Sequence, residues 1–274
     1  MKHAVRAFRN AFFSSGRRLF GLRFSRDYLL FAWRAARNWG YGGPGALEFL
    51  GHRLEYFNQS EALFLIHEIF VDAAYTFESS NPRPRIVDCG ANIGMAVLFF
   101  KTFRPDAEVI AFEPDPITFA RLVRTVDVNG LRDVRLENAA VGDKDGTVAF
   151  YGSGSGSGGI TASVEPSLGG DTRQEVRAIR LSSWIQEPID FLKLDVEGAE
   201  YDVVRDLIDT DAIRWVREAV IEYHALTARP DGVSHMIEAL KAAGFDIRVS
   251  AADAEGKIGL IRARRIEPAG YGPR

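Results

Sequence analysis

The spacing of hydrophobic and polar positions changes near residue 85. Before it, apolar residues recur every three or four positions, which predicts helices within residues 1–40 and over residues 58–77. After it, short apolar runs alternate with stretches of helical period. This alternation is typical of a largely parallel sheet with helices on both faces. We therefore predict an α/β domain over residues 81–274 and a helical N-terminal extension or cap over residues 1–80.

Seven short apolar runs supply the strands of the predicted sheet. They are Ile86-Val87, Glu108–Phe112, Val134–Leu136, Phe191–Leu194, Ala219–Glu222, Phe245–Ser250 and Lys257–Arg262. The last two are expected to close the sheet as an antiparallel pair. The helices between the strands are predicted at Ile93–Phe103, Pro116–Asn129, Tyr201–Ile208 and Ser234–Ala243.

Two further runs, Thr147–Tyr151 and Glu175–Arg180, predict an extra pair of strands. Between them lies Gly152–Gly159, which consists only of glycine and serine. Such a run is flexible when no ligand is bound. Two interpretations stay open, a mobile surface loop and a lid that orders over the substrate.

Composition places the chain among ordinary soluble globular proteins. Of its 274 residues 46% are hydrophobic and 26% charged, and no apolar run approaches the length that spans a bilayer. Its one cysteine, Cys89, excludes an intramolecular disulfide and favours a cytoplasmic location. The part of the chain beyond residue 40 is acidic, which argues against nucleic acid as a partner.

Residues 1–40 are rich in arginine and contain a single acid, Asp27. The arginines interrupt the apolar residues, which excludes a secretory signal, although an organelle transit peptide shares this composition. Two structural interpretations remain. A basic amphipathic helix can lie on an anionic membrane surface, or it can pack on the core or on a partner chain with its arginines in water. We favour the packed arm. The oligomeric state is not predicted.

A glycine-containing turn follows the first strand, in the segment Ile86-Val87-Asp88-Cys89-Gly90-Ala91-Asn92-Ile93-Gly94. Gly90 allows backbone angles that other residues avoid and leaves room for a ligand, and Gly94 permits close packing. The dinucleotide fingerprint is incomplete, because Asn92 holds its middle glycine position. The Asp88 carboxylate suits the ammonium and sulfonium of S-adenosylmethionine better than a pyrophosphate. The predicted cofactor contacts are Asp88, Gly90, Ala91, Asn92 and Gly94.

The next two strand ends extend this site. Glu113 ends the second strand, where an acid can accept both hydroxyls of a ribose, although a lone acid there can also be a helix cap or a solvated charge. The small residues around Ala139, after the third strand, would let an adenine ring lie against the backbone. Asn138 or Asp143 could hydrogen-bond that ring.

The fourth strand ends in Phe191-Leu192-Lys193-Leu194-Asp195-Val196-Glu197-Gly198-Ala199-Glu200. Three carboxylates and a lysine are costly to bury unless they are paired or used. Asp195 and Glu197 could position an acceptor hydroxyl and take its proton, or coordinate Mg²⁺. Glu197 and Glu200 could instead only favour a helix N-terminus. His224 follows the fifth strand at the same edge and could be a general base near neutral pH, although a lone histidine is usually structural.

Together and in this order, these segments resemble the FkbM family of methyltransferases over about residues 50–250. Asp88-x-Gly90 is shared by many methyltransferases, whereas Lys193-x-Asp195-x-Glu197-Gly198-x-Glu200 is much more specific. The other matching segments are Phe112-Glu113-Pro114, Ala139-Ala140-Val141-Gly142-Asp143 and Ile221-Glu222-Tyr223-His224. One departure is Leu181-Ser182-Ser183, where the family often has Leu-Asp. An acid that binds substrate or metal there in relatives would have no counterpart in this chain.

The resemblance implies a Rossmann-like class I methyltransferase fold, S-adenosylmethionine as cofactor, and methylation of a hydroxyl on a sugar, glycan, polyketide or peptide-type metabolite. We predict that Asp195, Glu197 and His224 face the acceptor, and we assign no metal ligands. Two alternatives remain. The incomplete glycine fingerprint argues against an NAD(P)-dependent oxidoreductase, and the acids at Glu113 and Asp195 argue against a non-catalytic binding module on the same fold.

Overall fold

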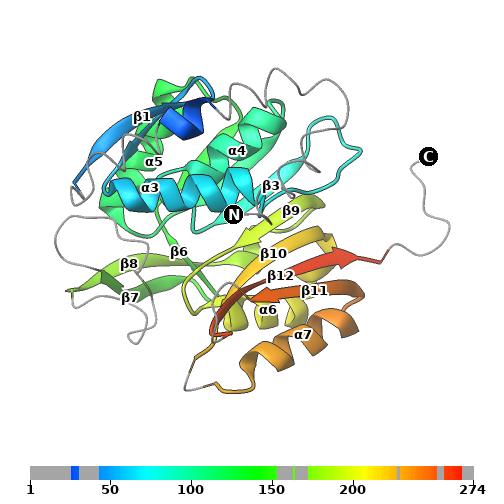
Figure 1. The fold of residues 1–274 in the computed structure, drawn as a ribbon. Helices are drawn as coiled ribbons and strands as arrows, with labels where there is room; N and C mark the ends of the chain where they lie inside the picture. The colour runs from blue at the N-terminus through cyan, green and yellow to red at the C-terminus, as the bar shows by residue number, and fades with distance from the viewer. Residues whose placement is uncertain are drawn as a thin grey trace.

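A seven-stranded sheet crosses the centre of the protein (Figure 1). The computed structural model describes residues 26–30, 43–152, 163, 172–226, 229–251 and 256–266. The strand order is β11-β12-β10-β9-β3-β4-β5. These strands are β3 (Arg85–Cys89), β4 (Glu108–Phe112), β5 (Val134–Glu137), β9 (Ile189–Leu194), β10 (Val216–His224), β11 (Phe245–Ala251) and β12 (Ile258–Arg265).

The pairing of the strands confirms the predicted sheet. β5, β4, β3, β9 and β10 run parallel to one another, and β12 is antiparallel to both β10 and β11. The carboxyl ends of β3, β4, β9 and β10 therefore meet at one edge. Ligands bind at this edge in open α/β sheets. This is the class I methyltransferase-like arrangement, a mostly parallel sheet with a final antiparallel strand.

Helices cover both faces of the sheet (Figure 1). On one face lie α4 (Met95–Phe103) and α5 (Pro116–Val128), and on the other lie α6 (Glu200–Asp209), η3 (Ala212–Trp215) and α7 (Gly232–Ala242). Alternate strand residues point to opposite faces, so Ile86 belongs to the core under α4 and Val87 to the core under α6. None of the helices in the described part of the chain has the length and apolarity needed to cross a membrane.

The N-terminal region contains strands that the sequence analysis does not predict. β1 (Gly45–Phe49) and β2 (His52–Tyr56) form an antiparallel hairpin whose turn contains Leu50 and Gly51, both with positive φ. The extension over residues 1–80 is thus not helical throughout. The helices predicted within residues 1–40 lie outside the described residues, except for a helical stretch at residues 26–30.

The helix predicted over residues 58–77 is shorter than expected. α3 (Gln59–Ile66) begins at Asn58, whose side chain accepts hydrogen bonds from the N–H groups of Ser60 and Glu61. It continues as a single π-helical turn, η1 (His67–Val71), and helix geometry then ends. Buried residues of this region join the core under α4, so the cap and the sheet share one hydrophobic core.

The extra strands form a separate small sheet of order β6-β8-β7. β7 (Gly146–Gly152) and β8 (Thr172–Arg180) pair as predicted, in antiparallel orientation, and β6 (Ala140–Gly142) pairs with β8 in parallel. η2 (Leu181–Ser183) then leads towards β9. The glycine and serine run from residue 153 onward lies outside the described residues, so neither interpretation of it is tested.

Candidate active site

The turn after β3 is held between the ends of β4 and β9. The N–H groups of Gly90 and Ala91 donate to the carbonyl of Phe112, at 3.0 and 2.8 Å. Gly90 has φ +85°, and a Cβ atom there would overlap the carbonyl oxygen of Asp195. Only glycine fits such a position. Gly94 has φ +93°, and a Cβ atom there would lie 2.9 Å from Leu122 of α5, so this glycine serves helix packing.

Glu113 is held at the end of β4 by two backbone donors. Its Oε2 accepts from the N–H of Asn92 and its Oε1 from the N–H of Asp115, both at 2.9 Å. Only 7% of the residue is exposed, and burial raises its pKa to about 8. In the ionised form each carboxylate oxygen can accept more than one hydrogen bond, so both then retain capacity for a ribose hydroxyl.

Asn138 and Ala139 lie beside Glu113. The side-chain amide of Asn138 donates to the carbonyls of Glu113 and Pro114, at 2.8 and 3.0 Å. Asn138 therefore fixes the backbone after β4, and the adenine contact predicted for it from the sequence stays a prediction. Ala139 is fully buried and adds no bulk there.

Asp88 is fully buried, with its Oδ1 3.4 Å from the Nζ of Lys193. Neither carboxylate oxygen has a hydrogen-bond partner among the described residues. The sequence predicts that Asp88 contacts the cofactor's charged groups, either directly or through water or backbone amides. Its burial beneath the turn argues instead for an indirect role through Lys193.

Lys193 connects the cofactor turn with the end of β9. Its Nζ donates to the carbonyl of Gly90 at 2.7 Å, lies 3.2 Å from Asp195 Oδ2, and faces the ring of Tyr75 at 5.3 Å. Burial lowers the pKa of Lys193, but the carboxylates of Asp195 and Asp88 raise it well above its usual value. Lys193 therefore stays protonated. The sequence analysis assigns it no role, although a lysine within the apolar run of β9 was a usable signal.

The structure brings the three predicted acceptor-facing residues together. Asp195 and Glu197 each expose about a quarter of their side chains, and His224 is buried. The Nε2 of His224 lies 3.1 Å from Glu197 and its Nδ1 lies 3.2 Å from Glu200. The Ser163 hydroxyl also donates to the backbone carbonyl of Glu197.

His224 is charged at neutral pH, which differs from the predicted neutral base. Burial lowers the pKa of His224, but the hydrogen bond that its Nδ1–H donates to Glu200 and the charges of Glu200 and Glu197 raise it to about 9. Glu200 is fully buried and accepts from the N–H groups of Val196 and Gly198. Glu200 therefore orders the loop after β9 and holds His224. This role goes beyond the interaction with a helix N-terminus that the sequence also allowed.

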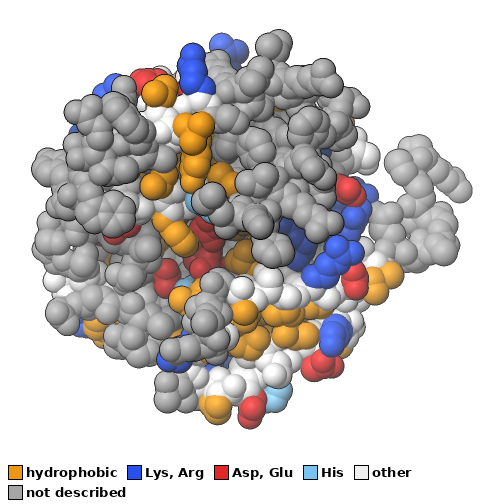
Figure 2. Space-filling model, in the orientation of Figure 1, with side chains coloured by type: hydrophobic (Ala, Val, Ile, Leu, Met, Phe, Trp, Pro, Cys, Tyr) orange, Lys and Arg blue, Asp and Glu red, His pale blue; other side chains and the backbone are white. Residues whose placement is uncertain are grey.

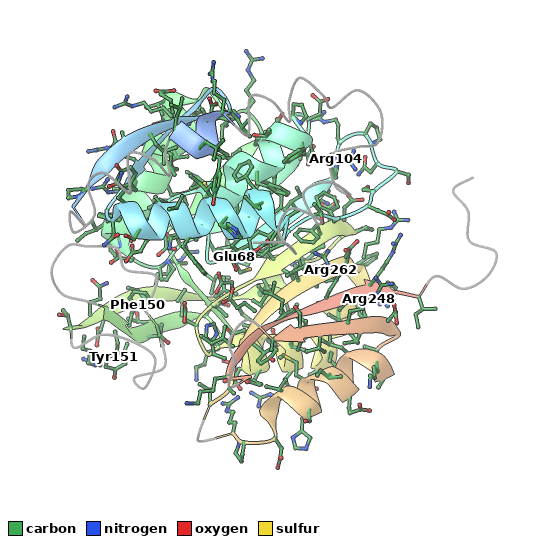
Figure 3. All side chains as sticks on the ribbon, viewed as in Figure 1. Glu68, Arg104, Phe150, Tyr151, Arg248 and Arg262 are labelled. Carbon is green, nitrogen blue, oxygen red and sulfur yellow. The ribbon has the colours of Figure 1, made fainter. Side chains whose placement is uncertain are left out.

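Two further carboxyls that the sequence analysis does not assign lie near Asp195. Burial and the charges of Asp195 and Glu68 raise the pKa of Glu222 to about 9, and burial and the charge of Asp195 raise that of Glu68 to about 7. Figure 2 shows acidic side chains recessed between apolar ones on this face of the molecule. In Figure 3, Glu68 lies between the end of α3 and strands β9 and β10.

No three His, Cys, Asp or Glu side chains among the described residues are arranged to hold a metal ion.

Comparison with known proteins decides the family. Residues 88–247 match the model of the Methyltransferase FkbM domain. The chain is 31% identical over 249 residues to Methyltransferase sdnD of Sordaria araneosa, covering 78% of this chain and 94% of that one. The chain belongs to the FkbM family of methyltransferases.

Two other relatives extend this result. The chain is 33% identical over 231 residues to 31-O-demethyl-FK506 methyltransferase FkbM of Streptomyces tacrolimicus, covering 72% of this chain and 86% of that one. It is 33% identical over 144 residues to 2-O-methyltransferase NoeI of Sinorhizobium fredii (strain NBRC 101917 / NGR234), covering 45% and 57%. The protein is an S-adenosylmethionine-dependent methyltransferase, and the oxidoreductase alternative is set aside.

The residues of this FkbM-family site fit S-adenosylmethionine. The cofactor is a cation at sulfur, and the carboxyls near Asp195 outnumber the cations Lys193 and His224. Glu113 offers paired acceptor oxygens at the end of β4, and the turn at Gly90 allows close approach of a ligand to the backbone. Charge and shape therefore agree with the cofactor that the family uses.

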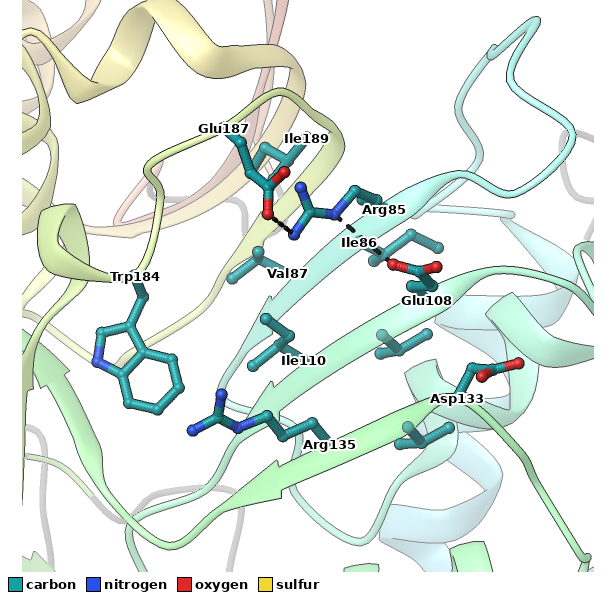
Figure 4. A pocket seen from close by; sticks show the side chains of 12 residues that line it. Arg85, Ile86, Val87, Glu108, Ile110, Asp133, Arg135, Trp184, Glu187 and Ile189 are labelled. Carbon is teal, nitrogen blue, oxygen red and sulfur yellow. Dashed lines mark ion pairs between the residues drawn. The ribbon is translucent and has the colours of Figure 1, made fainter.

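A hollow of about 370 Å³ lies toward the opposite ends of β3, β4 and β5 (Figure 4). Its floor contains Val87 and Ile110, and Arg135 stacks 4.4 Å above the ring of Trp184. At its rim Arg85 pairs with Glu187 at 2.6 Å. Because it is remote from the carboxyl ends of the strands, this pocket is not the methyl-transfer site.

Proposed function

We propose that the protein transfers the methyl group of S-adenosylmethionine to a hydroxyl oxygen of a small-molecule or glycan acceptor, such as a sugar or a polyketide- or peptide-type metabolite. One relative is named as a methyltransferase of 31-O-demethyl-FK506 and another as a 2-O-methyltransferase, which supports oxygen as the methylated atom. The observation that carries the proposal is the partly exposed Asp195 carboxylate, held by Lys193 beside the turn at Gly90.

On the cofactor side, Glu113 would accept the ribose hydroxyls through its two oriented oxygens. Bound S-adenosylmethionine supplies a methyl group activated by the positive charge on sulfur. The backbone from Gly90 to Asn92 would line the cofactor, while Gly94 and Asn138 keep that backbone and the end of β4 in place.

On the acceptor side, Asp195 would take the hydroxyl proton as the new oxygen–methyl bond forms. The ammonium of Lys193 lies 3.2 Å from the Asp195 carboxylate and orients it. Protonated His224 holds Glu197, which would accept a hydrogen bond from the acceptor. Positioning of this kind can supply up to about 7–11 kcal/mol of a reaction barrier.

The proposal also covers the domain organisation of the chain and the location of the protein. We infer that residues 1–80 act as a cap on the methyltransferase domain over residues 81–274, because residues of both ranges share one core. The contact of the basic segment within residues 1–40 with a membrane or partner protein stays a prediction, as does a cytoplasmic location.

Calorimetry with S-adenosylmethionine and with NAD(H) tests the cofactor assignment directly. Binding of S-adenosylmethionine alone is expected. Hydroxylated sugars, glycans and macrolides are then screened with isotopically labelled cofactor, and products are identified by mass spectrometry. A product methylated on nitrogen or carbon, or binding of NAD(H) alone, would refute the proposed function.

A further inference from the structure

The turn η1 carries Glu68 onto the catalytic face of the sheet from outside residues 88–247, the part that matches the family model. Ile69, Phe70 and Val71 of this turn are buried, and the Phe70 ring meets those of Phe49 and Phe99 edge-on, at 5.0 and 5.3 Å. Its position is therefore fixed by core packing. Single π-helical turns inside helices occur frequently at functional sites.

Strand register places Glu222 on the same face. Val220 pairs with Lys193 and Ile221 with Leu194, so Glu222 lies next to Asp195 on the neighbouring strand. Because side chains two apart in a strand share a face, Lys193, Asp195 and Glu222 all point toward the face that α3 and η1 cover.

The segment after η1 is anchored over the same point. Arg262 of β12 donates to the carbonyls of Ala74 and Thr76, at 2.6 and 2.5 Å, and to Glu218 at 2.8 Å. These bonds hold Tyr75 between them, with its buried ring 5.3 Å from Lys193. The N-terminal cap is thus a fixed wall of the site.

The charges around Asp195 are unevenly matched. Lys193 pairs with Asp88 and Asp195, and His224 with Glu197 and Glu200. Neither Glu68 nor Glu222 forms an ion pair with any described residue. The other charged or titratable groups that face them are Asp72 and Tyr75. Two carboxyls at this point are therefore left to interact with a ligand.

We propose that Glu68, together with Glu222, acts on the positive charge at the methyl-transfer point and makes the site prefer S-adenosylmethionine over its product S-adenosylhomocysteine. The inference rests on the proposed function in one respect, that Asp195 marks the transfer point. Transfer of the methyl group to the acceptor oxygen leaves the sulfur as a neutral thioether, while the hydroxyl proton goes to Asp195. The attraction to Glu68 and Glu222 then disappears, which favours product release.

The test needs no knowledge of the acceptor. Dissociation constants for S-adenosylmethionine, S-adenosylhomocysteine and sinefungin, an analogue with an amine in place of the methylated sulfur, are measured by calorimetry. The proteins compared are the wild type, Glu68→Gln, Glu222→Gln, Glu113→Gln and the control Glu61→Gln. Glu61 lies on α3, and only burial affects its pKa. Measurements are made at about pH 8, where Glu68 is ionised.

Glu68→Gln is expected to reduce the preference for S-adenosylmethionine and sinefungin over S-adenosylhomocysteine by about tenfold, equivalent to about 1.4 kcal/mol. Glu222→Gln is expected to reduce this preference by a smaller factor at pH 8, because burial and neighbouring carboxylates raise the pKa of Glu222 to about 9. Binding of S-adenosylhomocysteine stays nearly unchanged, which also shows that the variants are folded. Glu113→Gln is expected to weaken the binding of all three ligands by similar factors, and Glu61→Gln is expected to change the dissociation constant of none of them.

An unchanged preference in Glu68→Gln, or equal losses for the charged and neutral ligands, would overturn this inference and leave the proposed function standing. Wild-type protein that binds none of the three ligands would overturn both.

Discussion

The carbonyl oxygen of Asp195 occupies the space that a Cβ atom on Gly90 would need. The turn proposed to line the cofactor and the strand end that carries the proposed base are therefore in direct backbone contact. Lys193 reinforces this contact, because its ammonium bridges the Gly90 carbonyl and the Asp195 carboxylate. Cofactor binding and placement of the base depend on the same few atoms.

Gly90→Ala is expected to lose S-adenosylmethionine binding and to lower the free energy of unfolding. Backbone strain at φ +85° costs about 1–3 kcal/mol, and overlap with Asp195 adds to it. Calorimetry and chemical denaturation measure the two effects. The control is Gly142→Ala, where an added Cβ meets no atom within 4 Å. Wild-type binding by Gly90→Ala would contradict the close contact.

Lys193→Met is expected to destabilise the protein by about 3–5 kcal/mol, because Asp88 becomes a buried charge without a partner. Adding Asp88→Asn should recover much of this loss in chemical denaturation. Lys241→Met, which removes an exposed lysine paired with Glu238, serves as the control and should cost at most about 1 kcal/mol. Equal stability of the single and double variants would show that the pairing matters little.

The free energy of unfolding is expected to fall as pH rises from about 5 to about 9. Folding raises the pKa of Glu113 to about 8 and that of Glu68 to about 7, mainly through burial. The stability from their protonated forms is complete below the unfolded pKa of 4.5 and is lost as pH rises through the folded pKa. His224, raised to about 9, adds a loss of the same sign between its unfolded pKa of 6.5 and pH 9.

Chemical denaturation across this pH range measures the effect, and Glu113→Gln should flatten the slope between about pH 5 and 8. Glu238→Gln, at an exposed site, should leave the slope as it is. A stability that stays constant or rises over this range would be inconsistent with buried, protonated carboxyls.

His224→Asn is expected to lower turnover about tenfold to a hundredfold while the dissociation constant of S-adenosylmethionine changes little. The reason is that His224 holds Glu197 on the acceptor side, away from Glu113. Steady-state kinetics and calorimetry separate the two quantities. His235→Asn, on the exposed surface of α7, is the control. A parallel loss of turnover and cofactor affinity would place His224 on the cofactor side.

The sequence predicts the sheet well because most strands are short apolar runs bounded by breakers. β4 has the predicted bounds, Glu108–Phe112, and Pro114 follows two residues after its end. The hairpin of β1 and β2 is not predicted, because its alternation of buried and exposed residues extends over only five residues in each strand.

The sequence predicts which strand ends contribute residues to the site. Glu113 and Asp195 follow parallel strands and His224 is the last residue of another, and the carboxyl ends of these strands must share an edge. Which side chains pair with one another at this edge is decided by the tertiary structure. The burial of Asp88 against Lys193, and the approach of Glu68 from the N-terminal cap, depend on packing between segments far apart in the sequence.

The most direct test of the central claim is transfer of a ¹³C-labelled methyl group to the acceptor identified by the screen, followed by NMR. The account predicts that the label appears on oxygen with the wild-type protein. With Asp195→Asn it should appear at least about a hundredfold more slowly, although that variant still binds S-adenosylmethionine. A label on nitrogen or carbon, or transfer by Asp195→Asn at the wild-type rate, would contradict the account.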